Sequence, residues 1–290
     1  MTAGNDATLA IAVFAHNEAG NIVRCLDSVL DSLAGHTGTH RIHVLNNGST
    51  DNSEAVIQAY ATQHPAITQA VIQAGDKANA WNHFVHDMGV SADRYIFVDG
   101  DVTIDRGAIP ALLAALSRQP HAHIATGVPG SGRNRALQLA TLRSEGGVQG
   151  NLYAARGSFI QSLFERGIRM PFGFIREDGL IGAYAMYDLD PVHSHWDKTR
   201  IAIVEDALFR FPSLRWYSPH DIRLYWRRRK RYSLGWYQVM LLLPVIRKDG
   251  FEASPARVEA LYPGLDAIKP GWRGTNTFFD WLVLRDLDRH

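Results

Sequence analysis

The chain has 290 residues, of which 46% are hydrophobic and 20% are charged, an ordinary composition for a globular protein. Its 30 Lys and Arg nearly balance its 29 Asp and Glu, so the net charge gives no reason to expect a polyanionic partner. The single cysteine, Cys25, excludes an intramolecular disulfide and a thiolate metal cluster.

No stretch of the sequence approaches the ~20 apolar residues that a helix needs to cross a bilayer. The nearest candidate, residues 239–246, is too short and contains Pro244. The first residues carry no basic leader, and their apolar run is typical of a first strand rather than of a signal sequence. We therefore expect a cytoplasmic protein, with contact to the inner face of a membrane as an open alternative.

Strand-like and helix-like patterns alternate through the first hundred residues. Apolar runs predict buried strands, and apolar residues at three- and four-residue spacing predict amphipathic helices between them. This alternation predicts a Rossmann-like α/β fold, with a mostly parallel sheet flanked by helices. The expected strands are residues 9–14, 41–45, 67–72 and 95–98, and the expected helices cover residues 22–33, about 51–60 and 78–88.

The second half of the chain is less regular. Residues 108–116 favour a helix, residues 123–126 and 150–155 favour strands, and a further helix runs from about residue 176 to Tyr187. The glycine-rich residues 127–135 predict a flexible loop. They are not a Walker phosphate loop, because no Gly-Lys-Ser/Thr follows at the required spacing.

Three polar clusters follow predicted strands at their carboxyl ends. They are residues 16–18, the turn-like residues 46–51, and Asp99-Gly100-Asp101. Ligands of parallel sheets bind beyond these strand ends, so the three clusters are expected to converge. Carboxylates near a core need a counter-charge, and a divalent cation shared with a diphosphate is a natural partner. The alternative for Asp99 and Asp101 is an acidic turn at a sheet edge.

The order and spacing of the motifs over about residues 7–235 resemble the family-2 glycosyltransferases, which have the GT-A fold. The first motif reads FAHNE at residues 14–18, without the family's usual proline. The second reads NNGSTD at residues 46–51, with Asn in place of both leading acids. The remaining motifs are a Lys-x-x-x-x-Asn helix start at Lys77, the metal motif Asp99-Gly100-Asp101, the pair Glu177-Asp178, and the basic–aromatic residues 228–232.

The resemblance implies an inverting glycosyltransferase that uses Mn²⁺ or Mg²⁺ and moves a sugar from a nucleotide-diphosphate donor to an acceptor hydroxyl. Asp101 is then a direct metal ligand, and Asp99 contributes to the metal or the ribose. Asp178 is the candidate general base, and Glu177 orients the acceptor or the base. Apart from the resemblance, both acids are simply favoured in the first turn of a helix.

The nucleotide is expected to contact the loops after the strands and the basic run. An Asn amide both donates and accepts, so one Asn can pair twice with uracil, which predicts a UDP-sugar donor. The alternative is that Asn46 and Asn47 only cap the next helix. Lys77 either neutralises phosphate, holds the base pocket or is solvated. The expected donor-binding set is Ala15, His16, Asn17, Glu18, Asn46, Asn47, Asp51, Lys77, Asp99, Gly100, Arg228 and Arg231.

Five consecutive basic residues begin at Arg227, and aromatic residues follow as far as Tyr237. Arg228 and Arg231 suit the departing diphosphate, since a guanidinium fork matches phosphate oxygens. The run also suits an anionic membrane surface, whereas the balanced net charge argues against nucleic acid. His193, His195 and His220 are candidates for an additional metal ligand, although most histidines in a chain with 13 of them are not ligands.

Two other functions stay open at this point. A sugar-phosphate nucleotidyltransferase has a similar sheet, but residues 15–20 do not supply the glycine-rich, basic loop that it needs. A non-catalytic nucleotide-sugar sensor or scaffold would account for the substituted motifs, although Asp101 and Asp178 are retained. We expect a GT-A domain over residues 7–235, with a C-terminal helical extension over residues 236–290 packed on it. The acceptor would be a carbohydrate, a lipid-linked compound or a small molecule.

Overall fold

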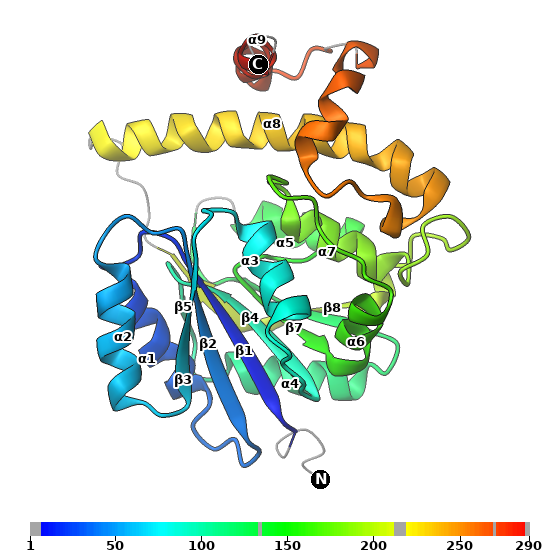
Figure 1. Ribbon diagram of the computed structural model, residues 1–290. Coiled ribbons are helices and arrows are strands. Elements are labelled where there is room, and N and C mark those ends of the chain that lie inside the picture. The colour runs from blue at the N-terminus through cyan, green and yellow to red at the C-terminus, as the bar shows by residue number, and fades with distance from the viewer. Residues whose placement is uncertain (1–6, 133–134, 212–218, 269–270, 288–290) are drawn as a thin grey trace.

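A computed structural model describes residues 7–287 except residues 133–134, 212–218 and 269–270, and without the side chains of residues 219–221 and 266–267. An eight-stranded sheet forms its centre, in the order β3-β2-β1-β4-β7-β6-β8-β5 (Figure 1). The strands are β1 (Leu9–Ala15), β2 (His40–Asn47), β3 (Ile67–Ile72), β4 (Arg94–Asp99), β5 (Thr103–Ile104), β6 (Ile124–Pro129), β7 (Leu152–Arg156) and β8 (Ile201–Arg210).

The prediction of a mostly parallel sheet is confirmed. β3, β2, β1 and β4 are parallel neighbours and β6 is parallel to β8, whereas β7 runs antiparallel to β4 and β6 and β5 runs antiparallel to β8. The reversal of β7 follows from where the strand starts. The Asp99 amide donates to the Asn151 carbonyl (3.1 Å), so β7 begins at the edge where β4 ends and runs back from it.

Two segments predicted as turn or loop belong to strands. Asn46 is paired with Ala15 of β1 and Val71 of β3, so neighbours on both sides hold it extended despite the turn preference of Asn. Residues 127–129 continue β6, where Pro129 pairs with Phe209 of β8. In both cases sheet pairing overrides local propensity, and the turn starts later than the sequence predicts.

The helices predicted for the first half of the chain are confirmed, as is the helix predicted near residues 176–187. The helix at residues 78–88 starts as α3 and continues as a π-helix over His83–Asp87. The sequence did not predict α5 or α6. The helices are α1 (Ile22–Ser32), α2 (Ser53–Gln63), α3 (Lys77–Asn82), α4 (Ala108–Arg118), α5 (Arg135–Glu145), α6 (Gly157–Glu165), α7 (Glu177–Met186), α8 (Pro219–Asp249) and α9 (Asn276–Leu287).

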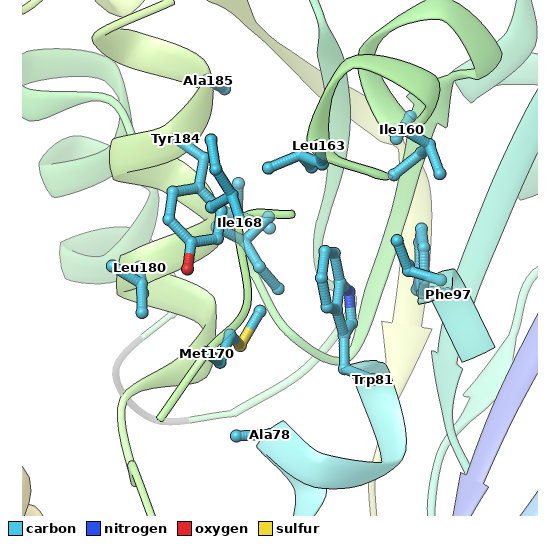
Figure 2. Close-up of a cluster of buried hydrophobic side chains, with 14 of the residues drawn as sticks. Ala78, Trp81, Phe97, Ile160, Leu163, Ile168, Met170, Leu180, Tyr184 and Ala185 are labelled. Atoms are coloured by element: carbon cyan, nitrogen blue, oxygen red, sulfur yellow. The ribbon is translucent and has the colours of Figure 1, made fainter. Parts of the chain in front are cut away.

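Each face of the sheet has its own hydrophobic core. Cys25 and Leu26 of α1 pack with Leu112 of α4 on one face, and the prediction that Cys25 is a core residue is confirmed. The other core joins the sheet to residues of α3, α6, α7 and α8 (Figure 2). At its centre Trp81 Nε1 donates to the Tyr153 hydroxyl (2.9 Å), and the Tyr153 ring stacks on Phe97 at 4.6 Å.

Helix α8 crosses above the carboxyl ends of the parallel strands, and α9 lies on its far side (Figure 1). Gln238 of α8 holds the segment before α7: its Oε1 accepts from the Ile175 amide (2.9 Å) and its Nε2 donates to the Gly173 carbonyl (3.1 Å). Helix α8 is continuous across residue 235, the predicted end of the GT-A domain. The domain boundary at residue 235 stays a prediction. In the part of the chain that the structure describes, no helix has the length and apolar character needed to cross a membrane.

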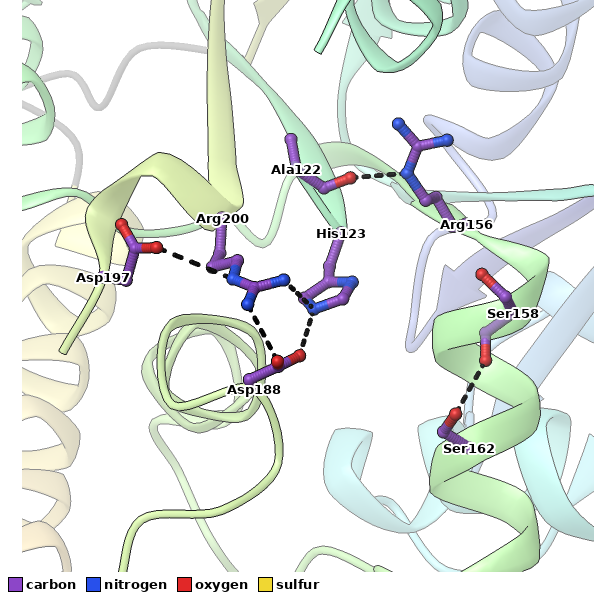
Figure 3. Close-up of polar contacts among 8 residues, drawn as sticks. All are labelled: Ala122, His123, Arg156, Ser158, Ser162, Asp188, Asp197 and Arg200. Atoms are coloured by element: carbon purple, nitrogen blue, oxygen red, sulfur yellow. Dashed lines mark hydrogen bonds and ion pairs between the residues drawn. The ribbon is translucent and has the colours of Figure 1, made fainter. Parts of the chain in front are cut away.

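The carboxyl end of α7 is tied to the sheet by a charged cluster (Figure 3). Asp188 contacts Nε2 of His123 (2.6 Å) and accepts from Arg200 (2.8 Å). Asp188 and Leu189 both have left-handed backbone conformations, with φ of 51° and 63°, which non-glycine residues adopt only where the surroundings enforce them. Burial lowers the pKa of His123, against the opposing effect of Asp188. The cluster fixes one end of the helix whose other end carries Glu177 and Asp178.

We expect Tyr153→Phe to destabilise the fold by about 1–3 kcal/mol, because the buried Trp81 N–H loses its acceptor. The matched control is Tyr184→Phe. Tyr184 is as buried as Tyr153, but its hydroxyl has no hydrogen-bond partner among the described residues, so its loss should be neutral or stabilising. Urea unfolding of both variants measures the difference, and equal effects would contradict the assignment.

Candidate functional site

A cavity of about 460 Å³ opens at the carboxyl ends of the parallel strands, below α8. Its wall combines the ends of β1, β2 and β4 and the segments that follow β1, β3 and β4 with residues 173–177 and one residue of α8. This convergence is the one that the polar clusters predict. The lining residues are Phe14, Ala15, His16, Glu18, Asn47, Gly75, Asp76, Lys77, Asp99, Gly100, Asp101, Gly173, Phe174, Ile175, Glu177 and Arg231.

The Lys77 ammonium lies between two carboxylates of this cavity. Its Nζ is 2.5 Å from Asp99 Oδ1 and 3.2 Å from Glu177 Oε1. The same nitrogen donates to the Gly150 carbonyl (3.4 Å), and the other oxygen of Asp99 accepts from Asn151 Nδ2 (3.0 Å). One lysine thus joins the start of α3 to the end of β4, the start of α7 and the loop before β7. Lys77 is therefore ion-paired rather than freely solvated, although it still lines the cavity.

The partly buried position of these groups changes their pKa values. Burial raises the pKa of Asp99 to about 6, and Lys77 only partly offsets this effect. Burial by itself would lower the pKa of Lys77, but the carboxylates of Asp99 and Glu177 outweigh it and hold that pKa above its usual range. At neutral pH the pair is therefore a charged lysine and an ionised aspartate.

Asp101 is the carboxylate that the site leaves available. Unlike Asp99, it makes no hydrogen bond or ion pair with any other described residue, and it lines the cavity. Glu18 lines the same cavity, and its carboxylate accepts a hydrogen bond from Asn21 Nδ2 (2.7 Å). Burial raises the pKa of Glu18, and the nearby charge of Asp101 adds to the rise. An unpaired carboxylate beside a second one is a donor set of the kind that hard divalent cations use. No cluster of three or more metal-ligating side chains exists within the described residues.

The loops after β1 and β2 are fastened to each other by the predicted residues Asn17 and Asp51. Asn17 has a φ of 58°, and its Oδ1 accepts from the amides of Thr50 (2.7 Å) and Asp51 (3.2 Å). Asp51 in turn accepts from the amides of Ala19 and Ser53. Neither Asn17 nor Asp51 lines the cavity, so in this structure both shape its rim.

Asn47 and Asn46 have different environments. Asn47 lines the cavity. Its Oδ1 accepts from the Asp76 amide (3.0 Å), and its main-chain carbonyl accepts from His16 Nδ1 (2.7 Å). Asn46 is 2% exposed, does not line the cavity, and its Oδ1 has no partner among the described residues. Neither side chain caps α2, where Asp51 bonds the Ser53 amide instead.

Glu177 and Asp178 form the first turn of α7 but face different surroundings. Glu177 lines the cavity, whereas Asp178 lies beside Gly150, where an added Cβ would come within 3.2 Å of the Asp178 Cβ and 3.4 Å of Lys77 Nζ. Gly150 therefore allows the close approach of Lys77 and Asp178. Burial raises the pKa of Asp178, and the neighbouring charge of Glu177 adds to the rise.

Of the predicted basic residues, Arg231 lines the cavity and Arg228 does not. His193 is exposed and contacts Asp190, and it does not line the cavity; nor does His195, while the side chain of His220 lies outside the described residues. The sequence prediction missed Gly75, Asp76 and residues 173–175. Asp76 could have been found, because an Asp directly before a helix start is a capping signal, and its Oδ1 indeed accepts from the Asn79 amide (2.6 Å).

Comparisons with known proteins agree with this architecture. The model of the family described as Glycosyl transferase family 2 matches residues 10–196. No curated protein matches the sequence.

Solved structures share the fold at low sequence identity. The mannosyltransferase PcManGT from Pyrobaculum calidifontis, in complex with GDP-Man and Mn²⁺, has a TM-score of 0.59 at 16% identity, over 98% of this chain and 81% of that one. Glucosyl-3-phosphoglycerate synthase from Mycobacterium tuberculosis, in complex with Mn²⁺, UDP-glucose and phosphoglyceric acid, has a TM-score of 0.54 at 21% identity, over 79% and 78% of the two chains. The predicted GT-A fold is thereby confirmed.

We expect Gly100→Ala to displace Asp99 and Asp101, because an added Cβ would lie 2.8 Å from the Phe14 carbonyl oxygen, with no flexible atom to yield. The control is Gly179→Ala in α7, next to Asp178, where no atom lies within 4 Å of an added Cβ. The control should gain about 0.5–1 kcal/mol of stability from helix propensity, whereas Gly100→Ala should lose at least that much. Thermal unfolding measures both, and an unchanged Tm for Gly100→Ala would contradict the close packing.

Proposed function

We propose a reaction for this glycosyltransferase, a chain that belongs to glycosyl transferase family 2. It moves a sugar from a UDP-sugar to an acceptor hydroxyl by a single in-line displacement, which inverts the anomeric carbon. The observation that carries the proposal is the placement of Lys77 between Asp99 and Glu177, with Asp101 free in the same cavity and Asp178 next along α7. This arrangement supports a site in which groups suited to the diphosphate and to the acceptor act together.

A divalent cation fits the donor set of Asp101 and Asp99. Asp101 has no hydrogen-bond or ion-pair partner among the described residues. Asp99 is ionised at neutral pH and is ion-paired with Lys77. When bound, Mn²⁺ or Mg²⁺ would neutralise the diphosphate as it leaves. The titles of the two solved structures described above name Mn²⁺ together with a nucleotide sugar, which supports the same requirement here.

Asn47 and Arg231 support the orientation of the donor. Because the Oδ1 of Asn47 is taken by Asp76, its Nδ2 is left to donate to a base carbonyl such as those of uracil. The two solved structures carry different bases, GDP in one and UDP in the other, so the base is a proposal from Asn47 alone. Arg231, which lines the cavity from α8, is suited to the diphosphate oxygens, with Arg228 one turn away on the same helix.

Asp178 takes the proton of the attacking hydroxyl in this proposal. Burial raises its pKa toward the range in which a carboxylate is an effective base. Glu177, which is ion-paired with Lys77, orients the acceptor or the base. The acceptor is a carbohydrate, a lipid-linked compound or a small molecule, and its hydroxyl must approach from the side of Asp178.

We expect Asp178→Asn to lower turnover by ~10²–10⁴-fold while leaving Mn²⁺-dependent UDP binding intact, because the amide keeps the shape of the carboxylate but cannot accept the proton. Release of UDP from UDP-glucose and other UDP-sugars, with and without Mn²⁺, measures turnover. Isothermal titration with UDP, GDP and CDP measures binding.

The matched variant is Asp101→Asn, which should lose the Mn²⁺-dependent part of UDP binding. Near-normal turnover of Asp178→Asn would reject the base assignment. Preferential binding of GDP would reject the uracil assignment, and an absence of nucleotide release with every donor would reject the reaction.

We expect Mn²⁺-dependent UDP binding to weaken as the pH falls through about 6, because Asp99 then gains a proton and loses its charge. UDP itself has a phosphate pKa of about 6, so the diagnostic measurement is the change of midpoint in Lys77→Met. Removing the ammonium raises the pKa of Asp99 further and should move the midpoint to higher pH. An unchanged midpoint in Lys77→Met would contradict the coupling of Lys77 to Asp99.

A further inference from the structure

The outer surface of α8 and α9 carries a connected group of aromatic rings. The ring centroids of Trp226 and Phe278 are 5.9 Å apart, and those of Phe278 and Trp281 are 6.3 Å apart. These three side chains, here named the aromatic patch, are 49%, 49% and 55% exposed. Trp272, in the segment that leads into α9, is 86% exposed. Contiguous exposed aromatic surface of this kind marks an interaction site.

The patch belongs to an ordered helix pair, because the other side of α9 is firmly packed on α8. Phe279 and Val283 of α9 are buried. Asp280, also buried, accepts from Ser233 of α8 and from Arg273 (2.9 Å). One face of α9 is therefore buried against α8. Phe278 and Trp281 lie on the opposite face, which is exposed to solvent.

Positive charge surrounds the aromatic patch. Arg223, Trp226 and Lys230 follow at spacings of three and four and share one side of α8. Arg285 lies over the Trp281 ring, 4.9 Å from its centroid. Between Ile222 and Lys248 the sequence has no Asp or Glu but has eight basic residues, namely Arg223, Arg227, Arg228, Arg229, Lys230, Arg231, Arg247 and Lys248.

The acidic residues of α9 offset only part of this charge. Asp280 is buried against Arg273, and Asp286 is paired with Lys230 and lies 3.5 Å from Arg285 Nη2. Arg223 and Arg227 are exposed and make no ion pair with any described residue. The solvent-facing side of the helix pair is therefore aromatic at its centre and cationic at its border.

We propose that the aromatic patch and its basic border bind the protein to an anionic phospholipid bilayer. Trp and Phe rings partition to the boundary of headgroups and acyl chains, and Lys and Arg are attracted to anionic headgroups. The site shares Arg227 and Lys230 with the basic run of residues 227–237 but does not use the aromatic residues Trp236 and Tyr237 of that run. Tyr237 of that run is buried, and Trp236 is covered by Arg273, whose guanidinium carbon is 4.0 Å from the Trp236 ring centroid.

Charge favours a bilayer over a second copy of the chain. Two such surfaces face to face would bring like charges together, which opposes association. A bilayer containing anionic lipid instead complements the border and accepts the aromatic rings. Because Arg231 and Gln238 of α8 contact the catalytic cavity and its wall, the bound helix would keep that cavity near the membrane surface.

The experiment is co-sedimentation of the full chain with vesicles of mixed phosphatidylglycerol and phosphatidylcholine, against vesicles of phosphatidylcholine alone. Binding is expected only to the anionic vesicles, and it should weaken as salt is raised. Each basic residue near an anionic surface strengthens binding about five-fold, so Arg223→Gln combined with Arg227→Gln should weaken it by about 25-fold at low salt.

The aromatic patch is tested by Phe278→Gln combined with Trp281→Gln, which should weaken vesicle binding by at least about ten-fold. The matched control is Phe164→Gln combined with Trp196→Gln, which removes rings of similar exposure elsewhere and should leave binding unchanged. UDP release without vesicles should be the same in all variants, which separates this proposal from the proposed reaction.

Equal binding to neutral and anionic vesicles would overturn the proposal, as would undiminished binding of the Phe278 and Trp281 variant. Light scattering measures the oligomeric state and so tests the alternative that the aromatic patch joins two copies of the chain. A dimer that this variant converts to a monomer would assign the patch to self-association instead.

Discussion

The site depends on one ammonium group. Lys77 Nζ is held by Asp99, Glu177 and the Gly150 carbonyl, which belong to segments that are 22, 100 and 73 residues away along the chain. Without the lysine, the carboxylates of Asp99 and Glu177 would share a partly buried cavity with no counter-charge between them, which is unfavourable. With it, Asp99 keeps its charge and the start of α7 is held beside the end of β4. Asp101, by contrast, lines the cavity without a hydrogen bond or ion pair to any other described residue.

The scaffold around this ion pair explains why the cavity persists. Asn17 and Asp51 fasten the loops after β1 and β2, and Gln238 of α8 fixes the segment before α7 by bonds to its main chain. At the far end of α7, Asp188 with Arg200 and His123 ties the helix to β6 and β8 (Figure 3). Glu177 and Asp178 therefore begin a helix that is anchored at both ends, which favours a preorganised arrangement of these two carboxylates.

Helix α8 links two surfaces of the protein. One side contributes Arg231 and Gln238 to the cavity and its wall, and the other side packs against α9 through Ser233 and Asp280. The helical period consequently divides the long basic stretch. Arg231 lines the cavity, whereas Lys230 borders the aromatic patch. The same basic run therefore contributes both to the cavity and to the border of the aromatic patch.

The sequence alone determined most elements of the first half of the chain and the residue types at the ends of its strands. Strand patterns and the acidic pair at 99 and 101 predicted the sheet and its ligand edge, because side-chain period and strand polarity are local properties. Only the tertiary structure decided that Asn46 and Asn47 stay in β2, that β7 runs antiparallel, and that Lys77 joins Asp99 to Glu177. The aromatic patch likewise needs Trp226 and Phe278 to meet across 52 residues of chain. Such contacts depend on packing between distant segments, and no local pattern encodes them.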